Sequence, residues 1–580
     1  VLLDNTMPMV RVADADREAL QRLVGAQALR SATPAGPGPT VTASADAATE
    51  VPPEAATTQG AHAPADGRDP AGDGAVTATL ELTAVDAAMA QHFALMRQFL
   101  DQSSHLAAFA VPAEAIDDGA FAAEAPVDDP AVPGAPAGAT LPMLDEVLSQ
   151  GADEIVARCH VSPARDAFMR DHVLSGPVAP EGSGRHGLSC VPLMVSLELM
   201  AEACAALAGR TDVRVIEHVK AFDWIALDEG EGELEVRARR LDGAALRFAA
   251  EVRTSRGTMI SAEFGFEADE RLPALAPLSE RRASCLNDPH LYATGMFHGP
   301  VFQSMRHVQA WDDDGIDVEG ADDALVGFFV DGESPDLVLN PVLLDAMGQL
   351  VACWLVQYVG TSFHSFPSTI GRIELPAVRP DASRGALMRA RQRPADGVST
   401  SIDAPRSWSV DCLDAEGRVL LRAGEFVNLF FRAPTAYHEF RTDPYAGQLG
   451  AAVDLGDQGQ GLLVWDVPLM PEEFCAQSGA ICLRVLAHAL LSADELQQWQ
   501  EMKAPLRRKR EWLFGRAAVK EAVRHWVHAA TGELPYATEV EVLVEPGGSL
   551  RVAGWWSESL VAAPRVSLPH TAASCVAAVA

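Results

Sequence analysis

The hydrophobic positions in the middle of the chain change their spacing in a regular order. Residues 191–207 form a dense apolar segment, in which Leu193, Met194, Leu197 and Met200 recur at helical spacing. The segments that follow alternate apolar and polar residues, which is the period of a half-buried strand. The pattern therefore predicts one long buried helix followed by several antiparallel strands, near 214–224, 232–240, 245–254 and 258–266.

The same order then returns further along the chain. A second apolar helix is predicted at 342–359, with strands near 368–378, 386–393, 407–412 and 418–431. A sheet wrapped round one long helix is the hotdog pattern. Helix-then-strands twice in succession predicts an α+β fold, a double hotdog, in which units at 142–275 and 276–440 share one sheet.

The flanking regions differ from this core. Residues 31–141 are rich in Ala, Pro, Gly, Thr, Ser and Asp, which predicts a mostly disordered linker with one amphipathic helix near 84–109. Residues 1–30 are expected to end an upstream region, because the start has neither Met nor a basic flank and looks like part of a longer polypeptide. Residues 455–580 predict a small α+β region, with helices near 481–490 and 506–529 and strands near 462–465, 538–545 and 564–568.

Charge and cysteine content narrow the class of protein. The chain has 45 Lys and Arg against 80 Asp and Glu, a formal net charge of −35, which argues against nucleic acid and against an anionic membrane surface as partners. Nine scattered cysteines without a CxxC pair indicate free thiols in a reducing cytoplasm. The sequence contains no run of about 18 apolar residues, which is the length that a membrane-spanning helix needs. We therefore expect a cytoplasmic protein.

Two segments of the double hotdog carry side chains suited to proton transfer. His172 lies in the first unit, and Asp345 and Gln349 lie one helical turn apart in the second. A His suits a base because its ordinary pKa is near neutral, and a buried carboxyl group suits an acid because burial raises its pKa. Taken singly, His172 could equally be a hydrogen-bonded or surface His, and Asp345 a helix N-terminal acid that interacts with the dipole.

Four short motifs in order resemble a known family. They are His172 with Gly176, Pro192 leading into Leu197-Glu198, the run His298-Gly299-Pro300-Val301-Phe302, and Asp345 with Gln349. Each motif is weak alone, but together they resemble the dehydratase domains of polyketide synthases and polyunsaturated fatty acid synthases. The resemblance covers roughly half of the chain.

The resemblance implies removal of water from a 3-hydroxyacyl chain carried on the phosphopantetheine of an acyl carrier protein. In that reaction a base takes the proton next to the carbonyl and an acid protonates the leaving hydroxyl. By resemblance His172 is the base and Asp345 the acid, and Gln349 and His298 support the site without transferring protons. Dehydration needs no cofactor. The implied partners are the carrier protein and other synthase domains, and a homodimer is expected by the same resemblance.

Two departures from the family pattern affect the site. Residues 177–191, which contain His186, are longer than the usual spacing and are either a surface insertion or a lid over the substrate. His298 stands where the family usually has Tyr, which puts that position's supporting role in doubt.

The last region resembles a second family. Residues 507–522 resemble the Arg-rich helix in the first half of 4′-phosphopantetheinyl transferases, and residues 566–571 resemble the strand that carries their conserved His. The resemblance implies contacts to the phosphates of coenzyme A, whereas the alternative is a solvated basic helix face. A metal site is not expected, because the acidic strand that would follow is absent and the chain is expected to end within this fold. The coenzyme A contacts implied are Arg507, Arg508, Arg510, Arg516 and His570.

Two other functions remain open for the double hotdog. A related thioesterase or isomerase could use the same tunnel, and a non-catalytic hotdog could serve as a scaffold for carrier proteins. The mass of a 3-hydroxyacyl carrier protein after incubation would distinguish them. Loss of water indicates a dehydratase, loss of the acyl group a thioesterase, and neither change a scaffold.

Overall fold

The computed structural model describes residues 141–580 with short gaps. The predictions for residues 1–140, including the linker and the helix near 84–109, lie outside the described residues. So does His570. The gaps are 242–245, 268–272, 287–290, 293–295, 321–324, 360–362, 376–386, 394–405, 456–461, 561–562, 570 and 572.

The first unit wraps six strands along one long helix. Helix α4 (Leu193–Ala208) is buried along most of its length, and it packs on strands of this unit. The helix ends at Gly209, whose φ of 66° is the left-handed conformation that glycine adopts most readily. A short helix, α3 (Phe168–Asp171), precedes it. The strands are β1 (Glu146–Gln150), β2 (Glu154–Val161), β4 (Val215–Ala221), β6 (Gly232–Arg240), β7 (Arg247–Thr254) and β8 (Gly257–Gly265), with a separate small pair, β3 (Ser189–Cys190) and β5 (Ala226–Leu227).

The second unit repeats this arrangement. Helix α5 (Pro341–Val359) packs on β10, β11, β12 and β14, and also contacts α4. A 3-10 turn, η1 (Pro300–Phe302), contacts α3 of the first unit and α5 of the second. The strands are β9 (Met305–Trp311), β10 (Gly315–Gly320), β11 (Phe363–Glu374), β12 (Leu387–Arg393), β13 (Arg406–Leu413) and β14 (Val419–Arg432).

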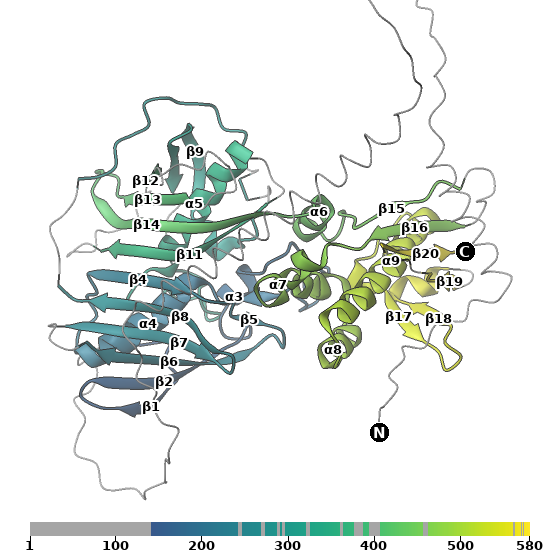
Figure 1. The fold of residues 1–580 in the computed structure, drawn as a ribbon, viewed down its shortest axis with the longest axis horizontal. Helices are drawn as coiled ribbons and strands as arrows, with labels where there is room; N and C mark the ends of the chain where they lie inside the picture. The colour runs from purple at the N-terminus through teal and green to yellow at the C-terminus, as the bar shows by residue number, and fades with distance from the viewer. Residues whose placement is uncertain are drawn as a thin grey trace, which may run out of the picture. The chain divides into compact units, whose positions relative to one another are not determined.

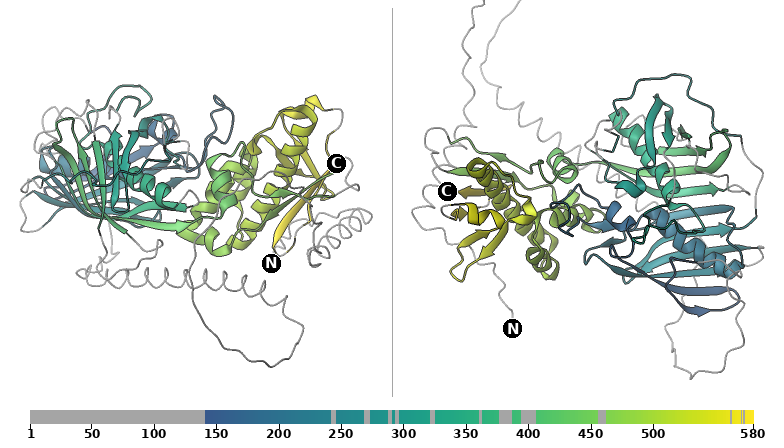
Figure 2. Two further views of the ribbon diagram at one scale, coloured as in Figure 1. Left: turned by 90° about the horizontal axis from the view of Figure 1, so that it is seen from above. Right: turned by 180° about the vertical axis from the view of Figure 1, so that it is seen from behind.

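The two units share one sheet (Figure 1). Its twelve strands follow the order β1-β2-β6-β7-β8-β4-β11-β14-β13-β12-β10-β9. The units join where β4 pairs antiparallel with β11, for example at Val219 and Ile370. This confirms the predicted shared sheet. The view from behind in Figure 2 shows the helices on one face of the sheet, and α4 and α5 also contact each other.

The C-terminal region (residues 435–580) has its own sheet and core. Six strands follow the order β15-β16-β20-β19-β18-β17, and helix α9 (Leu506–Thr531) packs on β16 and β20. Helix α7 (Glu472–Leu490) bends at residues 477–480. The remaining elements are α6 (Thr435–Thr442), α8 (Ala493–Glu501), β15 (Ala451–Ala452), β16 (Leu463–Pro468), η3 (Ala537–Glu539), β17 (Glu541–Val544), β18 (Leu550–Ala553), η4 (Trp555–Ser559), β19 (Val566–Ser567) and β20 (Ser574–Val579).

Residues 177–191 are only partly a surface insertion, because residues near both ends are buried and residues 180–184 between them are exposed. Val178 and Leu188 are buried in the same hydrophobic cluster as the core of the C-terminal region. The Thr538 hydroxyl donates a hydrogen bond to the Val178 carbonyl at 2.5 Å, and Arg185 donates one to the Leu491 carbonyl. The surface-insertion interpretation is therefore wrong for this part of the segment, because its apolar side chains are buried against the C-terminal region.

Candidate functional site

Two loops, one from each unit, pair through backbone hydrogen bonds at the site. His172 follows directly after α3, and it forms an isolated antiparallel bridge with His298. The Gly299 amide donates to the Asp171 carbonyl at 2.7 Å, and the Cys190 amide donates to the His172 carbonyl at 3.1 Å. These backbone bonds hold the two main-chain segments together, so both imidazole rings extend from one joined frame.

His172 is held as a neutral imidazole with one nitrogen free for chemistry. Its Nδ1 lies 2.8 Å from the Cys190 carbonyl oxygen, and a carbonyl can only accept, so Nδ1 carries the hydrogen. This leaves the lone pair on Nε2. Burial lowers the pKa of His172 to about 4, against the opposing attraction of Asp345. The ring is therefore unprotonated at neutral pH, which is the state that a base needs.

Asp345 lies in the second turn of α5 and accepts two hydrogen bonds. His298 Nε2 lies 3.1 Å from Oδ2, and Gln349 Nε2 donates to the same oxygen at 2.8 Å. Burial alone would raise the pKa of Asp345. The nearby His298, with smaller effects of His172 and Gln349, outweighs burial and lowers this pKa below its ordinary value. The expectation of a raised pKa was wrong, because the carboxyl group has close donors as well as apolar neighbours.

Gln349 fixes the orientation of Asp345. Its Oε1 accepts from the Tyr292 hydroxyl at 2.9 Å, and its Nε2 donates to the Phe302 carbonyl at 2.9 Å as well as to Asp345. Because the Phe302 carbonyl can only accept, Gln349 can only donate toward Asp345. The predicted contact from Gln349 to the acid is present, and Tyr292 is a partner that sequence reasoning missed.

His298 completes the group. Its ring stacks on Phe297 with centroids 4.3 Å apart, and its centroid lies 5.5 Å from that of His172. One nitrogen or oxygen atom from each of His172, His298 and Asp345 lies within 4.8 Å of the others. Such a set has the composition of a cation site, but the His298–Asp345 hydrogen bond already occupies the facing atoms, so we assign no metal to it. The structure thus brings together the base and the acid predicted from the sequence.

The glycines and prolines of the motifs occupy positions where the backbone restricts which residue can fit. A Cβ on Gly299 would lie 2.5 Å from the Asp171 carboxylate, and one on Gly176 would lie 2.3 Å from the Thr442 carbonyl oxygen. Pro192 caps the N-terminus of α4, and Pro300 begins the 3-10 turn η1. These four positions shape the frame of the site, and none of them offers a side chain for chemistry.

A buried carboxylate that the sequence did not single out for a role positions the second half of the site. Glu198 on α4 accepts the amide hydrogens of Val338 at 2.7 Å and of Leu339 at 2.6 Å. These two residues lead into α5, which carries Asp345. Glu198 therefore ties the helix of the first unit to the start of the helix in the second. The Leu197-Glu198 pair was the signal for it, but a motif gives no information about the partner.

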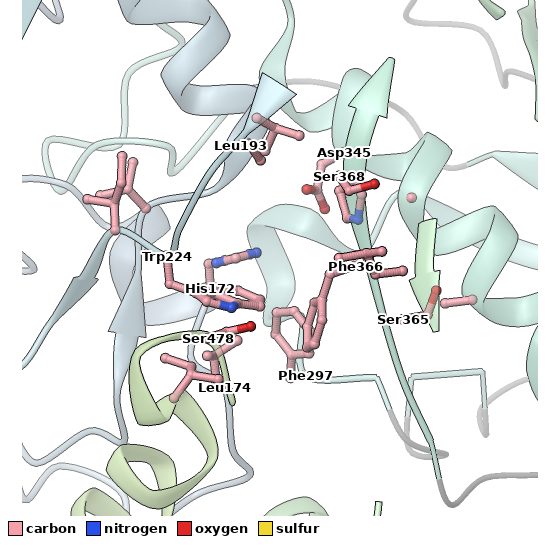
Figure 3. Close-up of a pocket in the computed structure, with 18 of the residues that line it drawn as sticks. His172, Leu174, Leu193, Trp224, Phe297, Asp345, Ser365, Phe366, Ser368 and Ser478 are labelled. Carbon is pink, nitrogen blue, oxygen red and sulfur yellow. The ribbon is translucent and has the colours of Figure 1, made fainter. Parts of the chain in front are cut away.

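A cavity of about 210 Å³ opens onto these groups (Figure 3). His172, His298, Asp345 and Gln349 form one polar part of its wall, and further polar lining comes from Asp223, Ser365, Ser368, Arg441 and Ser478. Other walls are mostly apolar, with Leu193, Met194 and Ile260 from the first unit, Phe297 and Phe366 from the second, and Ile481, Cys482 and Val485 from α7. Figure 3 shows His172, Phe297 and Phe366 around one space. A hydrophobic chain with one reactive polar end fits such a lining.

The basic residues predicted to hold coenzyme A lie on α9. Arg507 and Arg508 are exposed and pair with Glu511 at 3.0 and 3.7 Å. Arg510 lies 3.8 Å from Glu472, and Arg516 is buried and pairs with Glu495 at 3.4 Å. Of these four arginines, only Arg507 and Arg508 are exposed to solvent. Leu568, just after β19, would lie 3.2 Å from a Cβ added at Gly515, so this segment runs close to the helix.

Comparisons with known proteins concern the fold. No protein-family model matches the sequence, and no curated protein matches it. The pyran synthase domain from module nine of the sorangicin pathway is 18% identical over 50% of this chain and 99% of its own, with a TM-score of 0.37. The dehydratase domain from the CurJ module of the curacin polyketide synthase is 15% identical over 50% and 99%, with a TM-score of 0.37.

A third solved structure gives the same result. The dehydratase domain of PpsC from Mycobacterium tuberculosis, in complex with C12:1-CoA, is 19% identical over 50% of this chain and 100% of its own, with a TM-score of 0.39. These are hotdog folds that cover about half of this chain. At TM-scores below 0.5 the likeness decides nothing about the chemistry of the site. For the residues that the structure describes, no helix is long and apolar enough to cross a membrane.

Proposed function

We propose that the double hotdog is a dehydratase that removes water from a 3-hydroxyacyl thioester to give a 2-enoyl thioester. The observation that carries this proposal is the meeting of His172 and Asp345, from different units, with facing atoms within 4.8 Å at the polar end of an apolar cavity. Elimination needs a base and an acid on adjacent carbons of one chain. Two groups this close can reach both carbons of one bound substrate.

The proposed reaction accounts for each bond that forms and breaks. The unprotonated Nε2 of His172 takes a proton from C2, next to the thioester carbonyl, and the electron pair of that C–H bond forms the C2–C3 double bond. The C3–O bond breaks, and the departing hydroxyl takes a proton from the side of the site where Asp345 lies. His172 ends with one added proton and the opposite side with one fewer, and exchange through solvent restores both.

The cavity and the proposed reaction support an acyl thioester as the substrate class. The apolar walls of the cavity suit an acyl chain, and a thioester makes the C2 proton acidic enough for an imidazole base. We propose that the thioester is carried on the phosphopantetheine of an acyl carrier protein belonging to a larger synthase, with the other synthase domains as further partners. The wider class, polyketide or fatty acid synthase, and a homodimeric assembly belong to the same proposal.

The test is the mass change of a 3-hydroxyacyl carrier protein incubated with the full chain. Loss of one water from the acyl chain supports a dehydratase. Loss of the whole acyl group indicates a thioesterase, and no change indicates a scaffold, and either result contradicts the proposal. The matched control is His172→Gln, which keeps a polar side chain but offers no comparable base.

We also propose that the C-terminal region binds coenzyme A through Arg507 and Arg508. Their exposed guanidinium groups lie in the first turn of α9, where the positive end of the helix dipole adds to their attraction for phosphate. Binding measured by calorimetry should weaken steeply as salt rises and should fall further in Arg507→Gln/Arg508→Gln. Affinity that is unchanged in both cases would exclude this site.

A further inference from the structure

We propose that His298 carries the proton that leaves with the hydroxyl, with Asp345 as its ionised partner. This assignment rests on the proposed dehydratase function and changes the acid from one residue to a pair. His298 then belongs to the proton-transfer machinery, where the sequence predicted only support.

The hydrogen bonds at Asp345 identify it as an acceptor. Its Oδ2 lies 2.8 Å from Gln349 Nε2 and 3.1 Å from His298 Nε2. Gln349 has no freedom to turn its amide, because the Phe302 carbonyl and the Tyr292 hydroxyl fix both ends. Two donors directed at one carboxylate oxygen stabilise the ionised form. A lowered pKa of Asp345 agrees with this geometry.

An ionised Asp345 has no proton of its own to give at neutral pH. The nearest group that can hold one is His298, hydrogen-bonded to it at 3.1 Å. Nδ1 of His298 is buried and has no hydrogen-bond partner within the described part of the chain. Asp345, bonded to Nε2, is the group placed to compensate a charge on this ring.

Three other titratable groups in the described part of the chain lie near His298, and none of them is placed as a competing donor. His172, 5.5 Å away by ring centroids, has its Nδ1 hydrogen committed to the Cys190 carbonyl. Asp171 accepts the Val301 amide at 2.7 Å behind the turn that holds His298. The Tyr292 hydroxyl donates to Gln349, and burial raises its pKa further above its ordinary value.

The elimination then balances as follows. His172 Nε2 takes the C2 proton, and the electron pair forms the C2–C3 double bond. The C3–O bond breaks, and the departing oxygen takes the Nε2 proton of His298, so that water leaves. His298 becomes neutral and His172 becomes charged, and one proton passes back between them through solvent to restore the site.

The decisive variant is His298→Gln, whose amide can still donate to Asp345 but cannot give up a proton. We expect kcat at neutral pH to fall by about 10²-fold or more, with a small change in KM. Without the imidazole, Asp345 should hold its own proton more readily, so the residual rate of the variant should rise as pH falls. His160→Gln, the same change at a partly exposed His of β2, is the control and should keep the wild-type rate and pH profile.

A wild-type rate and pH profile in His298→Gln would overturn the proposal, because Asp345 alone would then be the acid. If His298→Gln fails to fold, as judged by circular dichroism, His298→Ala with added imidazole replaces it. Recovery of kcat with imidazole supports a proton-carrying ring, and an active variant that imidazole leaves unchanged contradicts it. Absence of water loss in the wild-type chain itself would instead remove the dehydratase proposal, so the two failures are distinct.

Discussion

A buried pair of acids on α4 should make the stability of the hotdog depend strongly on pH. Glu198 and Glu202 lie one turn apart and are both fully buried. Glu202 accepts the Met143 amide at 3.0 Å and the Leu144 amide at 3.2 Å. Burial, and next the neighbouring Glu198, raise the pKa of Glu202 from 4.5 to about 10. The folded protein therefore holds a proton at neutral pH that the unfolded chain releases.

The perturbation is Glu202→Gln, which resembles the protonated side chain and takes up no proton on folding. Because the folded pKa lies above the ordinary value, the stability that Glu202 gives is complete below about pH 4.5 and is lost as pH rises toward about 10. The loss is about 1.4 kcal/mol for each pH unit. The free energy of unfolding of the variant, relative to wild type, should therefore rise by roughly 4 kcal/mol between about pH 5.5 and about pH 8.5.

The assay is urea-induced unfolding at both pH values, with hydrogen exchange of α4 amides to assign the transition to the hotdog. The control is Glu233→Gln on the exposed side of β6, which should change stability little at either pH. A difference between Glu202→Gln and wild type that stays the same at both pH values would show that Glu202 takes up no proton on folding, and the reasoning would be refuted.

Two further predictions concern the site and its frame. Asp345→Ala should lower kcat by about 10²–10⁴-fold, and Gln349→Ala should lower it less, because the amide only orients the carboxylate; equal losses in steady-state assays would contradict this ranking. Gly176→Ala should destabilise the fold by about 1–3 kcal/mol, because the added Cβ would lie 2.3 Å from the Thr442 carbonyl oxygen. Gly547→Ala, where nothing lies within 4 Å, should not, and thermal unfolding that ranks the two variants alike would contradict the steric argument.

Local periodicity was enough to predict most elements of the double hotdog. The helices at 191–207 and 342–359 correspond to α4 and α5 within two residues, because each is apolar along its length and bounded by Pro or Gly. The hairpins β1–β2 and β9–β10 were not predicted. The edge strands β1 and β9 have several exposed positions, which weakens their apolar alternation. The buried positions of β2 do alternate, so this strand was missed although its sequence carries the pattern.

The candidate site was predicted only in part, because motifs name residues but not their partners. The proximity of His172 and Asp345 agrees with the motif order. The charge state of Asp345 could not be predicted, since it depends on His298 reaching it from another loop. The role of Glu198 depends on amides 140 residues further along the chain. The burial of Val178 and Leu188 likewise depends on contacts with the C-terminal region.

The central claim is that His172 takes the C2 proton while the opposite side of the site releases water. It is tested most directly with a 3-hydroxyacyl carrier protein deuterated at C2, in which loss of water and transfer of deuterium to solvent are followed together by mass spectrometry. We predict that wild type loses both at one rate, slower than with the undeuterated substrate, and that His172→Gln loses neither. Water loss at the wild-type rate in His172→Gln, or water loss that leaves all the deuterium at C2, would contradict this account.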